Sequence, residues 1–146
     1  MLDEAVTAIG TPNIALIKYW GKRDERLILP TNSSISITLD EQLNTRTSIL
    51  FSKKLKRDLF YINGERQDTN NRDVVERFDM INILRKMAKI NTKALVVSKN
   101  SFPTASGLAS SASGIATLTY SAAKALELRL STQELSIIAR RVILSH

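Results

Sequence analysis

The hydrophobic pattern of the chain changes its period near residue 70, and this change limits the folds that the chain can adopt. Up to that point, short apolar segments bounded by turn-forming residues predict β-strands in residues 5–19, 26–39 and 45–52. A bend at Gly10 and Pro12 divides the first of these into two pieces. Beyond residue 70, apolar residues recur mainly at helical spacing. Strands followed by helices predict an α+β fold, with helices packed on one face of a mostly antiparallel sheet.

Two local signals in the first half are more specific. The alternation of apolar and polar residues from Ile35 to Leu39 predicts a half-buried strand. Residues 58–68 predict a hairpin, because Asn63 and Gly64 supply the positive φ angles that a two-residue turn requires. Basic residues cluster at 53–57, and we interpret them as a solvated loop rather than as a nucleic-acid contact.

The second half begins with a helix and a strand. Residues 71–89 carry apolar side chains at helical spacing, and Asp73 and Glu76 lie in the first turn, where the helix dipole favours acidic groups. Residues 93–98 are short and apolar, which predicts a buried strand. One helix therefore precedes the last predicted strand.

Two further helices complete the predicted elements. After a loop at 99–107, the many small residues from about Leu108 to Leu128 predict a buried helix. The last helix opens at Ser131, which has capping-box spacing to Glu134. We expect residues 1–146 to form one domain, because a chain of this length can bury a core of its own.

The residue types that are scarce exclude several classes of chemistry. The chain has no cysteine, which excludes a disulfide scaffold, a zinc ribbon and a thiol nucleophile. Its single histidine, His146, argues against a Ser-His-Asp triad and against a multi-histidine metal site.

The charge of the chain favours anionic partners without indicating a nucleic-acid binder. Its 21 Lys and Arg outnumber its 14 Asp and Glu, and this excess suits phosphorylated small molecules. Aromatic residues make up only 5% of the chain and do not alternate with a basic stripe. The uncharged run Ser101–Ala123 contains nine Ser or Thr, which is too polar for a membrane span. We expect a cytoplasmic protein with no nucleic-acid or membrane partner.

The segment Pro103–Gly114 is the first candidate for chemistry. Ten of the twelve residues from Ala105 to Ala116 are Gly, Ala or Ser, and they lie where a loop enters a helix. Free backbone N–H groups at a helix start bind anions, and small side chains let phosphate oxygens approach. For residues 104–111 we favour a phosphate site, and for 112–125 a small-residue helix packed closely on a sheet. No Gly-Lys-Ser/Thr follows, so this is not a Walker loop.

The segment Pro12–Arg23 is the second candidate. Lys18 and Lys22 flank a Tyr-Trp-Gly break, and a strand that runs into Gly21 would leave them near one loop with Tyr19. Two ammonium groups and a phenol can hold a phosphorylated substrate. The alternative is an amphipathic strand end whose lysines extend into solvent.

Together the two segments resemble a known family. TPNIALIKYWGKRDERLILPTNSSISITL and SFPTASGLASSASGIA are similar to the N-terminal half of the diphosphomevalonate decarboxylase branch of the GHMP kinase superfamily. KYWGKRD and LPxNSS are specific to that branch, and Gly-Leu-Ala-Ser-Ser-Ala replaces the Gly-Leu-Gly-Ser-Ser-Ala of the kinases. The resemblance covers residues 8–141 and implies a GHMP-kinase N-terminal domain.

The resemblance implies a reaction and roles for individual residues. The family uses ATP and Mg²⁺ to phosphorylate and decarboxylate mevalonate 5-diphosphate, which gives isopentenyl diphosphate in isoprenoid biosynthesis. Lys18 would lie beside the reacting hydroxyl, and Tyr19 and Lys22 would hold the diphosphate. Ser111 would bind Mg²⁺, and full-length members are expected to be homodimers. The nucleotide would contact Ser98, Asn100, Thr104, Ser106, Gly107, Leu108, Ala109, Ser110, Ser111 and Ala112.

The chain also departs from the family pattern. Family members are longer and carry a Gly-Ser-Gly-Ser segment with a substrate-binding arginine, and later an aspartate that faces the reacting hydroxyl. The 146 residues end before either, so we expect this chain alone to be inactive. Ser101 stands where the family commonly has a second asparagine, a change that we expect to be mild.

Three functional hypotheses remain open from the sequence. The chain can be the N-terminal portion of a diphosphomevalonate decarboxylase, as a fragment or as a frameshifted or degenerate product. It can belong to a related archaeal-type kinase or decarboxylase that acts on mevalonate or mevalonate 5-phosphate. It can also be a non-catalytic module that binds nucleotide or phosphate.

Overall fold

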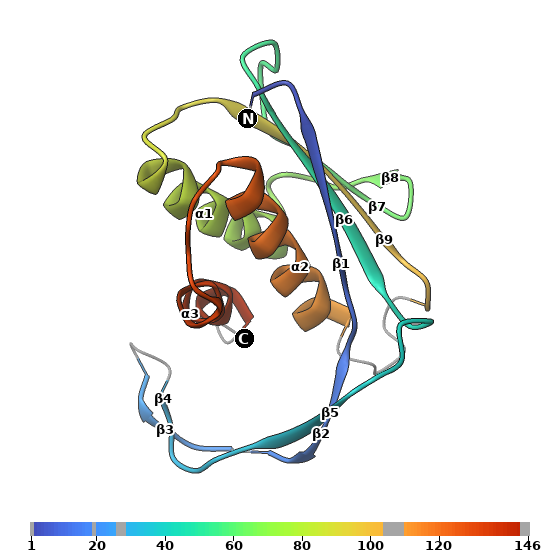
Figure 1. The fold of residues 1–146 in the computed structure, drawn as a ribbon, viewed down its shortest axis with the longest axis vertical. Coiled ribbons are helices and arrows are strands. Elements are labelled where there is room, and N and C mark those ends of the chain that lie inside the picture. The colour runs from blue at the N-terminus through green and yellow to red at the C-terminus, as the bar shows by residue number, and fades with distance from the viewer. Residues whose placement is uncertain (1, 19, 26–28, 104–109, 144–146) are drawn as a thin grey trace.

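The fold is built on a five-stranded sheet (Figure 1). A computed structural model describes residues 2–18, 20–25, 29–103 and 110–143. The strands lie in the order β1-β6-β9-β7-β8, and only the β7–β9 pair is parallel. The predicted α+β class with a mostly antiparallel sheet is therefore confirmed. The strand bounds are β1 Ala5–Gly10, β6 Thr45–Ser52, β7 Leu59–Ile62, β8 Glu65–Arg66 and β9 Lys93–Asn100.

Three helices cover one face of this sheet, as the sequence predicted (Figure 1). They are α1 (Arg72–Met87), α2 (Ser110–Ala125) and α3 (Thr132–Ile143). Helix α2 lies against β1 and β6, and α1 and α3 pack on α2. None of the helices in the described part of the chain is long and apolar enough to cross a bilayer.

The core lies between the sheet and the helices. Period-two alternation in β6 sends Ile49 and Phe51 into it, and the helical spacing of α1 does the same for Met80 and Leu84. All four side chains are at most 1% exposed, and Leu118 of α2 joins them. Burial of these apolar side chains is the main force that holds the helices on the sheet.

The local predictions are confirmed where they depend on backbone chemistry. Asn63 and Gly64 have φ angles of 50° and 86° and join β7 to β8. The basic residues at 53–57 lie in the turn between β6 and β7, where all the Lys and Arg side chains are exposed. This basic cluster is therefore a solvated loop.

The capping box at the start of α3 is also confirmed. The Ser131 hydroxyl accepts from the Glu134 N–H (3.2 Å), and the Glu134 carboxylate accepts from the Ser131 N–H (2.8 Å). The Ser131 hydroxyl also donates to this carboxylate at 2.8 Å, and the two hydrogen bonds donated by the backbone and the hydroxyl of Ser131 hold the pKa of Glu134 below its usual range. The folded state thus prefers the ionised carboxylate, so the cap stabilises α3 at neutral pH and loses this effect as the pH falls through the lowered pKa.

A separate two-stranded ribbon corrects one sequence prediction. Strand β2 (Asn13–Ile17) pairs with β5 (Ile35–Thr38) to form this ribbon. A second two-stranded sheet is formed by β3 (Lys22–Asp24) and β4 (Leu29–Pro30). The prediction that the strand from Ile35 is half-buried is wrong, because Ile35 and Ile37 are 55% and 54% exposed. The ribbon extends beyond the main sheet (Figure 1), and its strands pair only with each other in the described chain, so no layer covers them.

Candidate active site

The two lysines of the segment 18–22 lie between the ribbon and the β3–β4 pair. Lys18 follows the end of β2, and Lys22 is the first residue of β3. Both side chains are exposed, and Trp20 between them is 90% exposed. The strand that was predicted to run into Gly21 ends at Ile17, and the two lysines lie at the two ends of the short connection between β2 and β3.

The loop that carries these lysines is held by the segment 30–33. The Thr31 N–H and the Thr31 hydroxyl both donate to the Gly21 carbonyl oxygen, at 3.0 and 3.1 Å. The Asn32 amide donates to the Ser33 carbonyl oxygen at 2.9 Å and lies 3.5 Å from that of Lys18. A Cβ at Gly21 would lie 3.0 Å from the Thr31 side chain, so a larger residue here would press on Thr31. Two segments that are distant in sequence thus form one unit.

A second group of polar side chains lies on β9 and the first turn of α2. The Ser98 and Thr47 hydroxyls are 2.9 Å apart, across the β6–β9 ladder. The Thr45 hydroxyl donates to Oδ1 of Asn100 at 2.8 Å and also lies 2.9 Å from the Ser113 hydroxyl. These contacts bring the end of β9 together with the start of α2, where the backbone N–H groups of a helix are free to bind an anion.

A groove separates the ribbon from the helices. Asn13 and Ser34 line it from the ribbon, and its volume is about 630 Å³. Its other wall comes from α2 and α3: Ala116, Thr119, Tyr120, Thr132, Leu135, Ser136, Ala139 and Arg140. Lys18, Lys22, Ser98 and Asn100 do not line this groove, so it is separate from the side chains that are predicted to bind phosphate groups.

Comparison with models of known families shows which proteins this chain is similar to. The family model described as "Diphosphomevalonate decarboxylase-like N-terminal domain" matches residues 10–145. The chain belongs to this family. The matched range includes the ribbon, the segments 18–22 and 30–33, and the start of α2, so the family pattern covers the whole candidate site.

Individual relatives of the diphosphomevalonate decarboxylase family agree. The diphosphomevalonate decarboxylase of Debaryomyces hansenii is 42% identical over 145 residues, which is 92% of this chain and 37% of the relative. The crystal structure of mevalonate diphosphate decarboxylase from Staphylococcus aureus superposes with a TM-score of 0.83 at 42% identity. It covers 97% of this chain, and the chain covers 41% of it. The chain thus spans well under half of the length of these relatives.

One solved structure of the family carries ligands. It is named "MDDEF in complex with MVAPP, AMPPCP and Magnesium", and it is 43% identical to this chain with a TM-score of 0.81. The match covers 94% of this chain and 41% of that structure. A family member that contains the same fold therefore holds an ATP analogue and magnesium.

Several residues that the family resemblance marks as site residues lie outside the described part of the chain. These are Tyr19, Thr104, Ser106, Gly107, Leu108 and Ala109. Ser110 and Ser111 are the first two residues of α2, and Ala112 follows, half-buried. Their roles stay predictions, as do those of Lys18, Lys22, Ser98 and Asn100.

The donor set at the start of α2 suits a hard cation that is bound mainly through phosphate oxygens. Serine hydroxyls are oxygen donors, and Mg²⁺ in nucleotide sites takes one or two protein ligands besides phosphates and waters. Among the described residues, no three His, Cys, Asp or Glu side chains gather into a metal site. Serine as a residue type at this helix start therefore fits Mg²⁺ that arrives with a nucleotide.

Sequence reasoning missed the residues that hold the candidate site together. Thr45 and Thr47 are 0% and 1% exposed on the face of β6 that also buries Ile49. Two threonines at core-facing positions of an alternating strand were the available signal, because a buried hydroxyl needs a partner. Ser101 also has a structural role: it accepts from the Asn44 N–H and donates to the Gln42 carbonyl oxygen, each at 2.8 Å.

Proposed function

We propose that this chain is the ATP- and substrate-binding portion of an ATP-dependent diphosphomevalonate decarboxylase. Such an enzyme phosphorylates the tertiary hydroxyl of mevalonate 5-diphosphate, and loss of the new phosphate together with CO₂ gives isopentenyl diphosphate. We further propose that residues 1–146 act as one domain, that the protein is cytoplasmic, and that it forms a homodimer.

The observation that carries the proposal is the attachment of the lysine loop to the segment 30–33. The double hydrogen bond from Thr31 to Gly21 fixes the loop that presents Lys18 and Lys22. This loop and the start of α2 are the parts of the chain best suited to bind phosphate groups. The relatives that share both segments are named diphosphomevalonate decarboxylases, which favours the diphosphate over mevalonate or its 5-phosphate.

Two groups of residues in this chain would bind two different anions, the substrate diphosphate and ATP. Lys22, with Tyr19, would bind the substrate diphosphate through charge and a hydroxyl donor. Lys18 would lie beside the tertiary hydroxyl and stabilise the negative charge that develops as it attacks the phosphoryl group. The backbone at the start of α2, with Ser98 and Asn100, would bind ATP. Mg²⁺ at Ser111 would neutralise charge on the transferring phosphoryl group.

A substrate panel tests the proposal directly. The complete gene product is incubated with ATP and either mevalonate, its 5-phosphate or its 5-diphosphate, and the release of CO₂ and ADP is measured. We expect equal amounts of CO₂ and ADP with mevalonate 5-diphosphate, and neither product with the other two substrates. ADP without CO₂ from either other substrate would identify a kinase, and no turnover with nucleotide still bound would identify a non-catalytic module.

The Lys22 assignment predicts a difference between the two substrates. We expect Lys22→Met to raise the KM for mevalonate 5-diphosphate about tenfold, because one charge-assisted hydrogen bond of about 1.5 kcal/mol is lost. The KM for ATP should change less than twofold. Lys53→Met, which removes an exposed lysine in the turn after β6, should change neither value. Equal increases in both KM values would show that Lys22 does not bind the diphosphate.

The metal assignment predicts a contrast within one helix. We expect Ser111→Ala to weaken Mg²⁺-dependent binding of a nonhydrolysable ATP analogue about tenfold, as measured by calorimetric titration. Ser121→Ala should have little effect on binding, because the Ser121 hydroxyl is fully buried and donates to the Leu118 carbonyl oxygen. Unchanged affinity in the Ser111 variant would remove its metal role.

A further inference from the structure

Asn100 is held at two points, its backbone N–H and its side-chain oxygen. Its backbone N–H donates to Oδ1 of Asn63 in the β7–β8 turn at 3.0 Å. Its own Oδ1 accepts from the Thr45 hydroxyl at 2.8 Å. Within the described parts of the chain, no hydrogen bond engages its Nδ2 group.

The Thr45 hydroxyl connects the side chain of Asn100 to that of Ser113. Thr45 has a single hydroxyl proton, which it donates to Asn100, because an amide oxygen can only accept. The Ser113 hydroxyl lies 2.9 Å from that of Thr45, which is also within hydrogen-bonding distance. Ser113 is 6% exposed and Thr45 is 0% exposed, so water does not compete for these bonds. With its Oδ1 accepting from Thr45, the Asn100 amide has its NH₂ group on the side away from the Thr45 hydroxyl.

The same contacts tie the first turns of α2 to the sheet. Ser113 lies one turn into α2, and its carbonyl oxygen accepts from the Thr117 hydroxyl at 2.6 Å. Thr45 therefore joins the helix that would bind phosphate to the strand end that carries Asn100. Its hydroxyl contacts a side chain on each of the two elements, Asn100 on β9 and Ser113 on α2.

We propose that Thr45 is a positioning residue of the nucleotide site: it orients Asn100 so that the amide NH₂ donates to a hydrogen-bond acceptor of the bound nucleotide, and it fixes the start of α2 relative to that donor. This inference rests on the proposed function, because it requires the nucleotide to lie at the end of β9 and the start of α2.

The test compares three threonine variants of the complete gene product. Thr45→Val keeps the shape of the side chain and removes the hydroxyl, and Thr45→Ser restores it. Thr119→Val is the matched control, because the Thr119 hydroxyl is also buried in α2 but donates to the Ile115 carbonyl oxygen. The readouts are calorimetric affinity for AMPPCP with Mg²⁺, the KM for ATP and for the phosphorylated substrate, and the melting temperature.

We expect Thr45→Val to weaken AMPPCP binding about fivefold to tenfold, as for the loss of one buried hydrogen bond. It should raise the KM for ATP and leave that of the phosphorylated substrate unchanged. Thr45→Ser should bind within about twofold of the parent protein, and Thr119→Val should bind as the parent does even if it melts earlier. Asn100→Asp should bind more weakly than Asn100→Ala, since it keeps the acceptor for Thr45 but replaces the donor with a charged oxygen.

The outcomes separate the two proposals. AMPPCP binding by the parent protein with equal affinity in Thr45→Val overturns the positioning role and leaves the function intact. Loss of affinity in Thr45→Val and Thr119→Val in proportion to their melting temperatures also overturns it, because the effect is then general destabilisation. A folded parent protein that binds no nucleotide refutes the proposed function.

Discussion

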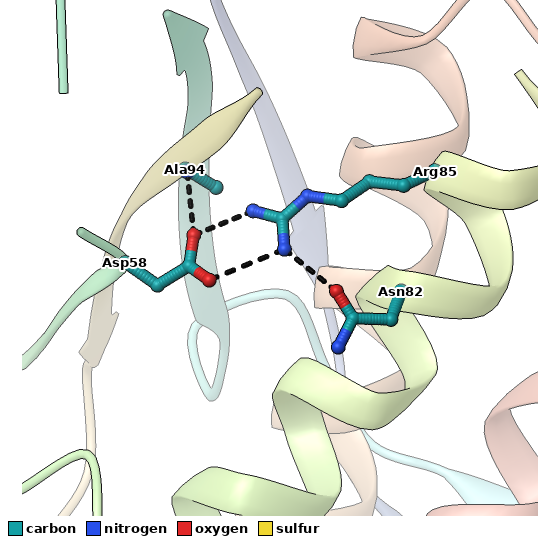
Figure 2. A network of polar contacts seen from close by, with 4 residues as sticks. All are labelled: Asp58, Asn82, Arg85 and Ala94. Atoms are coloured by element: carbon teal, nitrogen blue, oxygen red, sulfur yellow. Dashed lines mark hydrogen bonds and ion pairs between the residues drawn. The ribbon is translucent and has the colours of Figure 1, made fainter. Parts of the chain in front are cut away.

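We expect Asp58→Asn to lower the free energy of unfolding by about 3 kcal/mol, because it leaves the guanidinium of Arg85 without its counter-charge in the core. The Arg85 side chain is only 7% exposed, and that of Asp58 is 20% exposed. The Asp58 carboxylate binds both Nη atoms of Arg85 and accepts from the Ala94 N–H at 2.8 Å (Figure 2). One carboxylate thus connects the start of β7, helix α1 and strand β9.

The surroundings of Arg85 explain why a neutral amide cannot replace this carboxylate. Arg85 also donates to Asn82 at 2.8 Å, and its guanidinium carbon lies 5.5 Å from the centre of the Phe51 ring. These neighbours carry no negative charge, so they cannot compensate a buried cation.

Chemical denaturation measures this effect against an exposed ion pair. Arg72 and Glu76 are 3.0 Å apart on α1, but the Arg72 side chain is 71% exposed. Arg72→Gln should therefore change the free energy of unfolding by less than about 0.5 kcal/mol. Similar losses from Asp58→Asn and Arg72→Gln would contradict the role assigned to the buried pair.

The second large effect is expected at Gly10, where β1 meets α2. A Cβ at this position would lie 2.4 Å from the Thr117 hydroxyl oxygen, which is closer than real Cβ atoms approach. Thr117 is 3% exposed and its hydroxyl donates to the Ser113 carbonyl oxygen, so the side chain cannot turn away freely. We expect Gly10→Ala to lower the free energy of unfolding by about 2–3 kcal/mol through overpacking.

Two further variants isolate the cause. Removing the Thr117 hydroxyl in the double variant Gly10→Ala, Thr117→Ala should recover part of the loss, since the clash is with that atom. Gly114→Ala on α2 meets nothing within 4 Å and should stabilise the protein by about 0.5–1 kcal/mol through helix propensity. An unchanged melting temperature in Gly10→Ala would show that β1 and α2 do not approach this closely.

The features that could be predicted from sequence are those fixed by neighbouring residues. The β7–β8 turn follows from Asn63 and Gly64 alone, and the α3 cap follows from Ser131 and Glu134. The class of fold followed from the order of strand and helix periods, because each period reports which face of an element is apolar.

The features that could not be predicted depend on which elements meet. Alternation from Ile35 predicted a buried face, but a pattern does not contain the partner that would cover it, and the ribbon has none in the described chain. The pairing of Asp58 with Arg85 spans 27 residues, and nothing in the local pattern distinguishes this pair from solvated charges. Burial of Arg85 is visible only after α1 packs on the sheet.

The candidate site also combines a local feature that could be predicted with long-range contacts that could not. The spacing of Lys18 and Lys22 around Gly21 predicted that both lie near one loop, and they lie at the two ends of the connection between β2 and β3. The Thr45 contacts with Asn100 and Ser113 cross 55 and 68 residues of sequence. They became visible only through the register of β6 with β9 and the packing of α2.

The strand order also has a consequence for how the molecule is made. Strand β9 lies in the middle of the main sheet, yet it is the last strand of the described chain to leave the ribosome. Until then β6 can pair with β1 on one edge only, and its other edge offers unpaired N–H and C=O groups to any neighbouring strand. Because both ladders join segments far apart in the chain, we expect their closure to be slow and this edge to be exposed to aggregation until β9 pairs with it.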